Sequence, residues 1–201
     1  MIEELEKYAK ENRIPIMQKD GIEYLCNYIK NNNIKKILEI GSAIGYSAIK
    51  MAQVDPNIKI TTIEKDKERY NIAVQNIKKF NLENRIDLIL NDALNIDINK
   101  KYDLLFIDAS KGHNIDFFNK FKNNLLGNGV IITDNLSFHG LVENEELAIT
   151  KNQKGLVKKI KKYIDFLDTN REFNTKYVSV GDKISISIRK EVKDNYGKKE
   201  K

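Results

Sequence analysis

Short apolar runs alternate with amphipathic segments along most of the chain. Continuous runs such as ILEI, LLFI and VIIT are typical of strands that are buried on both faces of a sheet. Together with similar runs they predict strands at 35–40, 58–64, 86–90, 102–108, 129–134, 175–180 and 183–189. Apolar positions at helical spacing predict helices at 2–11, 19–31, 46–53, 66–80, 115–126 and 154–167.

The order of these elements predicts an α/β fold. Alternation of strands with helices indicates a doubly wound, mostly parallel sheet with helices on both faces. Gly181 and Asp182 form a tight turn between the last two runs, so these strands make a hairpin and one strand runs antiparallel. No repeat, low-complexity segment or Pro/Gly-rich hinge divides the chain. We therefore expect a single domain over 1–201, with N-terminal helices in 1–33 and a charged, frayed tail at 191–201.

Composition narrows the class of protein without choosing a function. The net charge of +6 hints at a polyanionic partner, but Lys, Asn and Ile are abundant together, and a solvated lysine surface explains the charge better. No apolar stretch reaches membrane-spanning length, and the start MIEELEKYAKEN does not resemble a secretory signal. Cys26 is the lone cysteine, which fits a reducing compartment. We expect a cytoplasmic protein.

A glycine-bordered loop at 41–45 follows the first predicted strand. Gly41 and Gly45 leave no side chain where the chain turns, so a ligand can touch the backbone there. The amides at the start of the next helix would face that ligand. The carboxylate of Glu39 suits an ammonium or sulfonium group better than a pyrophosphate. The loop therefore predicts S-adenosylmethionine rather than a dinucleotide.

Acidic residues stand at or near the carboxyl ends of the first five predicted strands, where ligands bind in sheets of this kind. Glu64 can accept hydrogen bonds from both hydroxyls of a ribose, or it can cap the helix that follows. Asp92 would lie beside an adenine, or cap the next helix. Because the glycine loop points to the same edge, we prefer the ligand-binding interpretation for both residues.

A second group of polar residues ends two later strands. Asp108, Asp134 and Asn135 offer only oxygen ligands, which suit Mg²⁺ or Mn²⁺; the alternative is two ordinary aspartates that loop amides satisfy. Lys111 is a candidate general base, because an ammonium beside a cation is disfavoured; otherwise it is a surface lysine that pairs with Asp108. His113 and His139 flank this group, and we interpret them as loop residues that could contact a substrate and not as metal ligands.

Four motifs, in the expected order, carry a resemblance to a known family. LEIGSAIGYSAIKMA, TIEKD, LLFIDASKG and GVIITDNLSFHGLV resemble the divalent-cation-dependent O-methyltransferases, which include the catechol and caffeoyl-coenzyme A enzymes. The resemblance covers 13–190 and implies a Rossmann-like class I methyltransferase fold with a seven-stranded sheet, and a homodimer. Within the family, the segment RIPIM at 13–17 and the motif TDNLSFHGLV are similar to bacterial enzymes that convert 5-hydroxyuridine to 5-methoxyuridine at the tRNA wobble position.

The resemblance also implies roles for individual residues. Those expected to bind S-adenosylmethionine are Met17, Glu39, Gly41, Tyr46, Ser47, Glu64, Asp92 and Asp108. Those expected to hold Mg²⁺ or Mn²⁺ are Asp108, Asp134 and Asn135, and the expected catalytic residues are Lys111 and Asp108.

The substrates of this family present two neighbouring oxygens to the metal. A catechol does so with two hydroxyls, and 5-hydroxyuridine does so with its 5-hydroxyl and 4-carbonyl, so one site could take either. The loop 136–148 could close over the pocket.

A tRNA anticodon loop would also need positive charge for its phosphates. The lysines that could supply it are Lys154, Lys158, Lys159, Lys161 and Lys162. Their spacing alone favours a solvated helix surface, and only the resemblance shifts the balance toward RNA. We therefore expect a tRNA 5-hydroxyuridine methyltransferase, with a catechol-type small-molecule enzyme as the alternative and a non-catalytic RNA-binding module as the third candidate.

Overall fold

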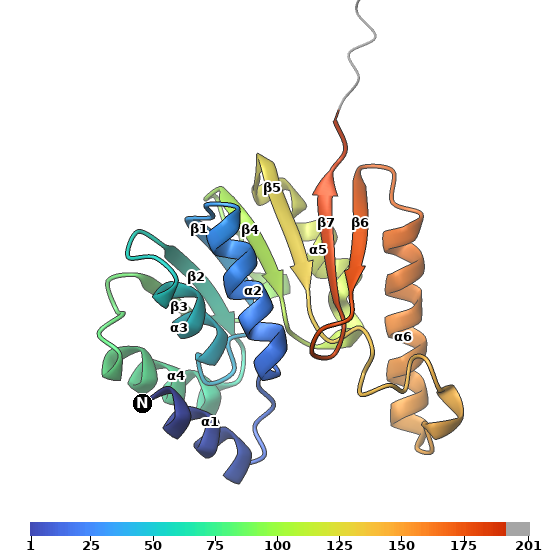
Figure 1. Ribbon diagram of the computed structural model, residues 1–201, viewed down its shortest axis with the longest axis horizontal. Helices are drawn as coiled ribbons and strands as arrows, with labels where there is room; N and C mark the ends of the chain where they lie inside the picture. Colours follow the sequence, from blue (N-terminus) through green and yellow to red (C-terminus); the bar gives the residue numbers. More distant parts are fainter. Residues whose placement is uncertain (192–201) are drawn as a thin grey trace, which may run out of the picture.

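A single seven-stranded sheet organises the protein, as described by a computed structural model for residues 1–191 (Figure 1). The strand order is β3-β2-β1-β4-β5-β7-β6. The strands are β1 Lys36–Ile40, β2 Lys59–Glu64, β3 Ile86–Leu90, β4 Tyr102–Ile107, β5 Leu125–Thr133, β6 Phe173–Val178 and β7 Ile184–Arg189. Only β7 runs antiparallel, to both β5 and β6, so the predicted fold class and its one reversed strand are confirmed. The predicted frayed tail lies, apart from Glu191, outside the described residues.

Helices cover both faces of the sheet, and each face has its own apolar core (Figure 1). The helices are α1 Ile2–Glu11, α2 Lys19–Asn31, α3 Tyr46–Gln53, α4 Lys67–Lys79, α5 Asn114–Phe121 and α6 Lys151–Asp168. Residues of α1 to α4 contribute to one core, and residues of α5 and α6 contribute to the other. Short 3₁₀ turns occur at η1 Ala93–Asn95, η2 Lys111–His113, η3 Lys122–Asn124 and η4 Glu145–Leu147. Within residues 1–191, no helix combines the length and apolarity needed to cross a bilayer.

Several predicted boundaries are wrong: β5 begins at Leu125 instead of 129, β6 covers Phe173–Val178 instead of 175–180, and two helices differ for a clear local reason. The helix predicted at 115–126 ends at Phe121, because Leu125 is buried as the first residue of β5, where it pairs with Tyr102. The helix predicted at 154–167 begins at Lys151, because Thr150 and Gln153 form a reciprocal capping box. The Thr150 hydroxyl accepts from the Gln153 amide at 3.1 Å, and the Gln153 side chain accepts from the Thr150 amide at 3.0 Å.

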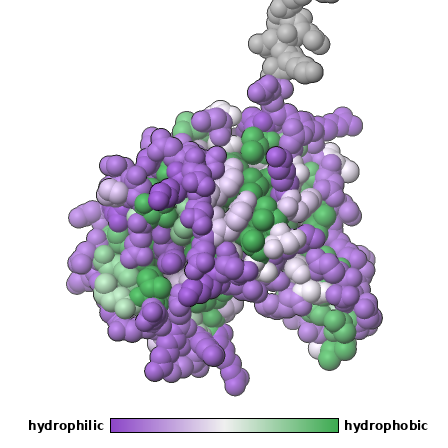
Figure 2. Space-filling model, in the orientation of Figure 1, coloured by the Kyte–Doolittle hydropathy of each residue, from purple (hydrophilic) through white to green (hydrophobic). Residues whose placement is uncertain are grey.

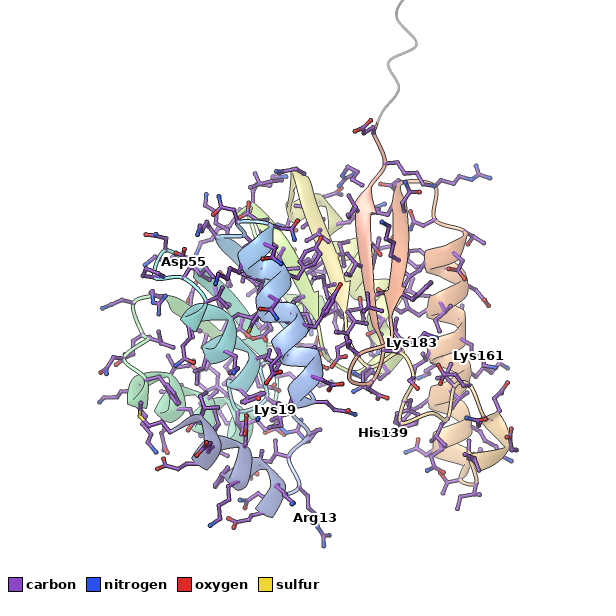
Figure 3. All side chains as sticks on the ribbon, viewed as in Figure 1. Arg13, Lys19, Asp55, His139, Lys161 and Lys183 are labelled. Atoms are coloured by element: carbon purple, nitrogen blue, oxygen red, sulfur yellow. The ribbon has the colours of Figure 1, made fainter. Side chains whose placement is uncertain are left out.

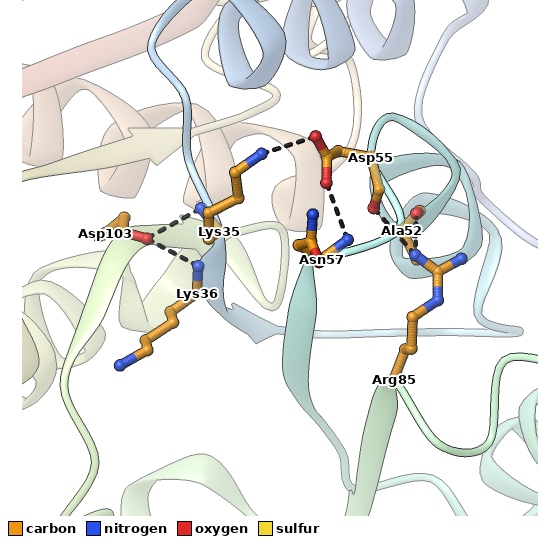
Figure 4. A network of polar contacts seen from close by, with 7 residues as sticks. All are labelled: Lys35, Lys36, Ala52, Asp55, Asn57, Arg85 and Asp103. Atoms are coloured by element: carbon orange, nitrogen blue, oxygen red, sulfur yellow. Dashed lines mark hydrogen bonds and ion pairs between the residues drawn. The ribbon is translucent and has the colours of Figure 1, made fainter.

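Polar contacts tie the sheet together at the amino ends of its central strands (Figure 4). The carboxylate of Asp103 accepts from the backbone amides of Lys35 and Lys36 at 2.9 and 2.7 Å. Arg85 donates to the carbonyl of Asp55 at 2.9 Å, and the Asp55 side chain pairs with Lys35 at 2.7 Å. These bonds lie at the amino ends of the strands. The predicted site residues stand at the opposite edge of the sheet, where the strands have their carboxyl ends.

Candidate active site

A cavity of about 650 Å³ opens at the carboxyl edge of the sheet, where the strand order reverses between β1 and β4. Its walls come from the ends of β1, β2, β4 and β5, from the segment 13–18, and from the turn between β6 and β7. The predicted site residues that line it are Met17, Gly41, Tyr46, Ser47, Glu64, Asp92, Asp108, Lys111, Asp134 and Asn135. The structure therefore brings the two predicted groups of residues into one space.

Gly41 allows the ends of β1 and β4 to approach closely beneath this cavity. Its φ of +95° lies in the left-handed region that side chains disfavour. A Cβ atom on Gly41 would also stand 2.4 Å from the carbonyl oxygen of Asp108. The glycine predicted from the loop pattern is thus required by both the backbone conformation and the space available.

Glu39 lies one layer below the cavity wall and is not among the residues that line it. Its carboxylate accepts from the hydroxyls of Ser47 and Thr62, each at 2.5 Å. Burial raises the pKa of Glu39 to about 7, although these two hydrogen bonds act to lower it. Glu39 thus holds Ser47 on the wall, and its expected contact with a ligand charge stays a prediction.

Glu64 lines the cavity with a carboxylate that the chain itself orients. One oxygen accepts from the amide of Ala43 and the other from the amide of Asp66, both at 2.8 Å. The alternative role as a helix cap is wrong, because Asp66 caps α4 by accepting from the amides of Glu68 and Arg69. A carboxylate oxygen has a second lone pair, so Glu64 can still accept from ligand hydroxyls.

We call the part of the cavity lined by the residues expected to bind the methyl donor its donor side. Three more residues of the donor side come from separate elements. Asp92 caps η1 by accepting from the amide of Leu94 at 2.9 Å and also lines the cavity, so both of its predicted roles coexist. Met17 is buried on the wall formed by 13–18. The Tyr46 hydroxyl donates to Glu6 at 2.8 Å, which joins α3 to α1. The N-terminal helix is therefore attached to this side of the cavity.

Asp108 and Asp134 follow the ends of the neighbouring strands β4 and β5, and the Asp134 amide donates to the Ile107 carbonyl at 3.1 Å. Asp134 is buried, and its Oδ1 has no hydrogen-bond partner. Burial raises the pKa of Asp134 to about 7, with a further contribution from the negative charge of Asp108. The interpretation that loop amides satisfy both aspartates is therefore wrong for this oxygen.

Lys111 has 15% of its side chain exposed and pairs with Asp108, so the alternative interpretation is confirmed in its ion pair but not in a surface position. Its Nζ lies 3.2 Å from Oδ1 of Asp108 and 3.3 Å from the amide oxygen of Asn135. This is the orientation of the Asn135 amide that satisfies both of its ends, because its nitrogen then donates to Asp182. A cationic group of the chain itself thus lies among the predicted metal ligands.

Asp182 is a site residue that the sequence analysis missed. It was interpreted only as part of a tight turn, yet it is 5% exposed and lines the cavity. Besides Asn135, it accepts from the amide of His139 at 2.7 Å. A buried acid in a β-turn has no sequence spacing that distinguishes it from an exposed one. His113 and His139 both line the cavity, as expected of loop residues, and neither is buried.

The donor set fits a hard divalent cation. Two carboxylates and one amide supply oxygen atoms only, and the buried Asp134 oxygen without a partner is the kind of atom that a cation would satisfy. Among residues 1–191, no cluster of three or more His, Cys, Asp and Glu side chains is arranged to bind a metal. A site with an amide as its third ligand agrees with that finding.

The cavity wall also contains basic residues, beside its acidic ones, that the sequence analysis did not assign to the site. Lys10, Arg13, Lys65 and Arg69 line the cavity. In the described part of the chain, none of these four has a carboxylate oxygen within 4.0 Å. In the view of Figure 3, Arg13 lies at the lowest point of the molecule, where the surface drawn in Figure 2 is hydrophilic, and His139 lies higher, between Arg13 and α6.

The predicted lysine cluster of α6 lies outside the cavity. Lys154, Lys158, Lys159 and Lys162 are exposed, whereas Lys161 forms an ion pair with Glu145. The expectation that all five act together is thus weakened at Lys161. The helix nevertheless contacts η2 beside Lys111, because the ammonium of Lys159 lies 3.0 Å from where a Cβ on Gly112 would stand.

Comparisons with known proteins agree with this geometry. Residues 1–190 match the O-methyltransferase family. A caffeoyl-CoA O-methyltransferase of Stellaria longipes is 26% identical over 94% of this chain and 83% of its own, and a flavonoid 3',5'-methyltransferase of Vitis vinifera is 27% identical over 92% and 82%.

Solved structures are similar as well. A crystal structure of a candidate caffeoyl-CoA O-methyltransferase from Staphylococcus aureus is 34% identical, with a TM-score of 0.89 over 94% of this chain and 92% of that one. An O-methyltransferase of Bacillus cereus in complex with SAH shares the fold, at 22% identity and a TM-score of 0.79 over 94% and 90% of the two chains. On the family match and the similarity to the Staphylococcus aureus structure, the chain belongs to the O-methyltransferase family.

Proposed function

We propose that this protein transfers a methyl group from S-adenosylmethionine to a hydroxyl oxygen that has a second oxygen beside it, with the help of a divalent cation. The observation that carries the proposal is the position of two groups in one cavity. Gly41, Ser47 and Glu64 line the same cavity as Asp108, Asp134 and Asn135. Such an arrangement would place a methyl donor and an activated oxygen side by side.

The donor wall suits S-adenosylmethionine. Glu64 would accept hydrogen bonds from the ribose hydroxyls, and Asp92 would lie beside the adenine. The wall at Met17, Gly41, Tyr46 and Ser47 would surround the methionine part. The Bacillus cereus relative binds SAH, the demethylated product of this donor, which supports the choice of donor.

Asp108, Asp134 and Asn135 would hold the cation. When bound, Mg²⁺ or Mn²⁺ lowers the pKa of a coordinated hydroxyl and orients two adjacent substrate oxygens. The unpartnered Oδ1 of Asp134 supports this assignment, because a buried carboxylate oxygen without a partner is costly unless a charge satisfies it.

Lys111 is the residue that we assign to proton transfer. Its neutral amine would take the proton of the substrate hydroxyl, and the substrate oxygen would then form a bond to the methyl carbon as the carbon–sulfur bond breaks. The electron pair of that bond stays on sulfur, so S-adenosylhomocysteine leaves as a neutral thioether. Opposite charges disappear in this step, and exclusion of water by the loop 136–148 would favour it.

Two substrate classes follow from this chemistry. The curated relatives are named for caffeoyl-CoA and flavonoids, which supports a small catechol-type substrate. The unpaired Lys10, Arg13, Lys65 and Arg69 around the cavity suit a substrate that carries phosphates, which is true of the second candidate, 5-hydroxyuridine in a tRNA anticodon loop, and also of a coenzyme A ester. A free catechol needs no such charge. The exposed lysines of α6 would contact further phosphates of the same loop.

A methyl-transfer assay with each substrate in turn separates the tRNA candidate from the catechol candidate. The protein would be incubated with labelled S-adenosylmethionine, Mg²⁺, and either tRNA that contains 5-hydroxyuridine or a catechol, with and without chelator. Whichever substrate is methylated, we expect the transfer to require the metal. Full activity in chelator would exclude the cation assignment. Methylation of catechols without any labelled tRNA would exclude the tRNA candidate.

A charge variant sharpens that assay. For a tRNA substrate, Arg13→Ala should lower kcat/KM by roughly tenfold, because a phosphate contact is lost. The matched control is Lys78→Ala, which removes the same charge from an exposed position of α4 outside the cavity. Equal effects of the two variants would argue against a phosphate contact at Arg13.

A further inference from the structure

We propose that Asp182 is a positioning residue that fixes the Asn135 amide so that its oxygen faces the predicted cation site. The proposal rests on the proposed function, because it concerns a ligand of the cation. It assigns a role to the turn between β6 and β7, far along the sequence from the acidic strand ends.

The hydrogen bonds of the Asn135 amide select one of its two orientations. Its nitrogen donates to Oδ2 of Asp182, and its oxygen accepts from Nζ of Lys111 at 3.3 Å. An ionised carboxylate can only accept, so a reversed amide would point its oxygen at Asp182 and its donors at the Lys111 ammonium. Asp182 therefore makes the oxygen of Asn135 available on the side of Asp108, where the cation would bind.

The Asp182 carboxylate is itself fixed. Its Oδ1 accepts from the amide of His139 at 2.7 Å, so it cannot rotate without breaking that bond. The carbonyls of Asp182 and Lys183 accept from the amides of Ser137 and Leu136, at 2.9 and 3.0 Å. The turn thus holds the whole segment 135–139 against the end of β5.

Helix α2 supports the turn from the other side. The Gly181 amide donates to Oδ2 of Asp20 at 2.9 Å. A Cβ on Gly181 would stand 3.2 Å from Cα of Gly21, and Gly181 has a φ of +55°, so the two backbones meet with no side chain between them. Asp182 therefore projects from a turn that rests on the same helix that follows the donor-side segment 13–18.

Burial explains why a carboxylate at this position needs a function. Asp182 is 5% exposed, and a buried charge is costly unless its partners compensate. A neutral acceptor would be enough to hold the amide of His139. Two side chains face the charged oxygen Oδ2: Nδ1 of His139 lies 3.8 Å away and is largely exposed, whereas the Asn135 amide donates to it directly. The contact with Asn135 is the one that bears on the cation site, because groups that orient metal ligands typically contribute about 10- to 100-fold to metal affinity.

The test measures Mn²⁺ binding to the full chain without donor or substrate, by the loss of the free-ion signal in electron paramagnetic resonance. Asp182→Asn should raise the dissociation constant of Mn²⁺ about tenfold. The matched control is Glu143→Gln, which removes the same charge from the loop but contacts Ser137 and Lys183 instead of Asn135. Its Mn²⁺ affinity should stay within about twofold of the wild type.

A second background shows whether Asp182 acts through Asn135. In a chain that already carries Asn135→Ala, Asp182→Asn should change the Mn²⁺ affinity by less than about twofold, because the group that it orients is gone. An equal loss in both backgrounds, or no loss in either, would overturn the proposal. The affinity for S-adenosylhomocysteine, measured by calorimetry, should be unchanged in Asp182→Asn. A general loss of structure would lower this affinity as well, so the measurement controls for misfolding.

Two further observations keep the outcome unambiguous. A wild-type chain that fails to bind Mn²⁺ would overturn the cation assignment together with this role, whereas Mn²⁺ binding that Asp182→Asn leaves intact would overturn the role alone. The wild-type chain also gives a test that needs no variant. The side-chain amide protons of Asn135 should exchange slowly with water in nuclear magnetic resonance spectra, and rapid exchange would contradict the hydrogen bond to Asp182.

Discussion

The two sides of the cavity satisfy their carboxylates in opposite ways. On the donor side, Glu39, Glu64 and Asp92 each accept hydrogen bonds from hydroxyls or amides of the chain itself. On the cation side, Asp134 keeps a buried oxygen without a partner, and Asp108 is paired with Lys111. The donor-side carboxylates are thus satisfied as folded, although the buried hydroxyl of Ser42 on that side has no partner, whereas the cation side carries negative charge that a divalent ion would neutralise. Substitutions on the donor side should therefore lower both the stability of the chain and its function. Substitutions on the cation side should lower function without lowering stability.

Asp134→Asn should have the largest effect. Loss of a metal ligand should reduce turnover by about 1,000-fold or more, because the cation contributes several kcal/mol to the transition state. The same variant should unfold at an equal or higher temperature than the metal-free wild type, since it removes a buried charge, one of whose oxygens has no hydrogen-bond partner. Turnover and thermal unfolding, each measured in chelator and in Mg²⁺, would reveal this separation. A destabilised variant would mean that Asp134 is satisfied in the folded chain.

Lys111→Met should reduce turnover by about 100-fold or more, because it removes the assigned base. Its Mn²⁺ affinity should be equal to or higher than that of the wild type, since an ammonium among the ligands opposes the binding of a cation. Single-turnover kinetics and Mn²⁺ titration would separate the two effects. Weaker Mn²⁺ binding would instead make Lys111 a part of the cation site.

Sequence patterns predicted much of the fold and of this site. The apolar runs identify the strands because a parallel sheet is buried on both faces, and the acidic residues at their carboxyl ends meet because parallel strands end together. Asp182 and the basic residues Arg13 and Arg69 were missed, because they reach the cavity through loops and helix packing that no local period encodes. The depth of Glu39 was missed because a one-dimensional pattern does not show which wall atoms a ligand meets. The homodimer stays a prediction.

Glu64→Ala tests whether the donor side depends on its fixed carboxylate. We expect the dissociation constant of S-adenosylhomocysteine to rise roughly tenfold in calorimetry, because charge-assisted hydrogen bonds to a ligand contribute about 1.5 kcal/mol or more. The chain should also lose stability, since two backbone amides lose their acceptor. The matched control is Asp66→Ala, which removes the cap of α4 without touching the cavity. A similar loss of affinity in the control would remove Glu64 from the donor site.

Glu39→Gln should have the smallest effect of these variants on function. We expect its effect in the way the stability of the fold changes with pH. Because the pKa of Glu39 is raised to about 7 in the folded chain, the folded state binds more protons than the unfolded state between pH 4.5 and 7. The stability that the protonated carboxyl provides is complete below its unfolded pKa and is lost as the pH rises through 7. The neutral glutamine does not titrate, so the variant loses no stability in this way. Its free energy of unfolding should therefore increase relative to that of the wild type as the pH rises.

Thermal unfolding from pH 5 to pH 8 measures that difference. The Tm of Glu39→Gln minus that of the wild type should rise across this range by several degrees, with an upper limit of roughly 3 kcal/mol, because each pH unit between 5 and 7 contributes about 1.4 kcal/mol. Asp134 titrates in the same range, but it is present in both chains and cancels in the difference. Glu23→Gln, at an exposed position of α2, should leave the difference flat. If the Glu39→Gln difference were also flat, the carboxylate would be charged at little cost, and the hydroxyls of Ser47 and Thr62 would compensate its burial fully.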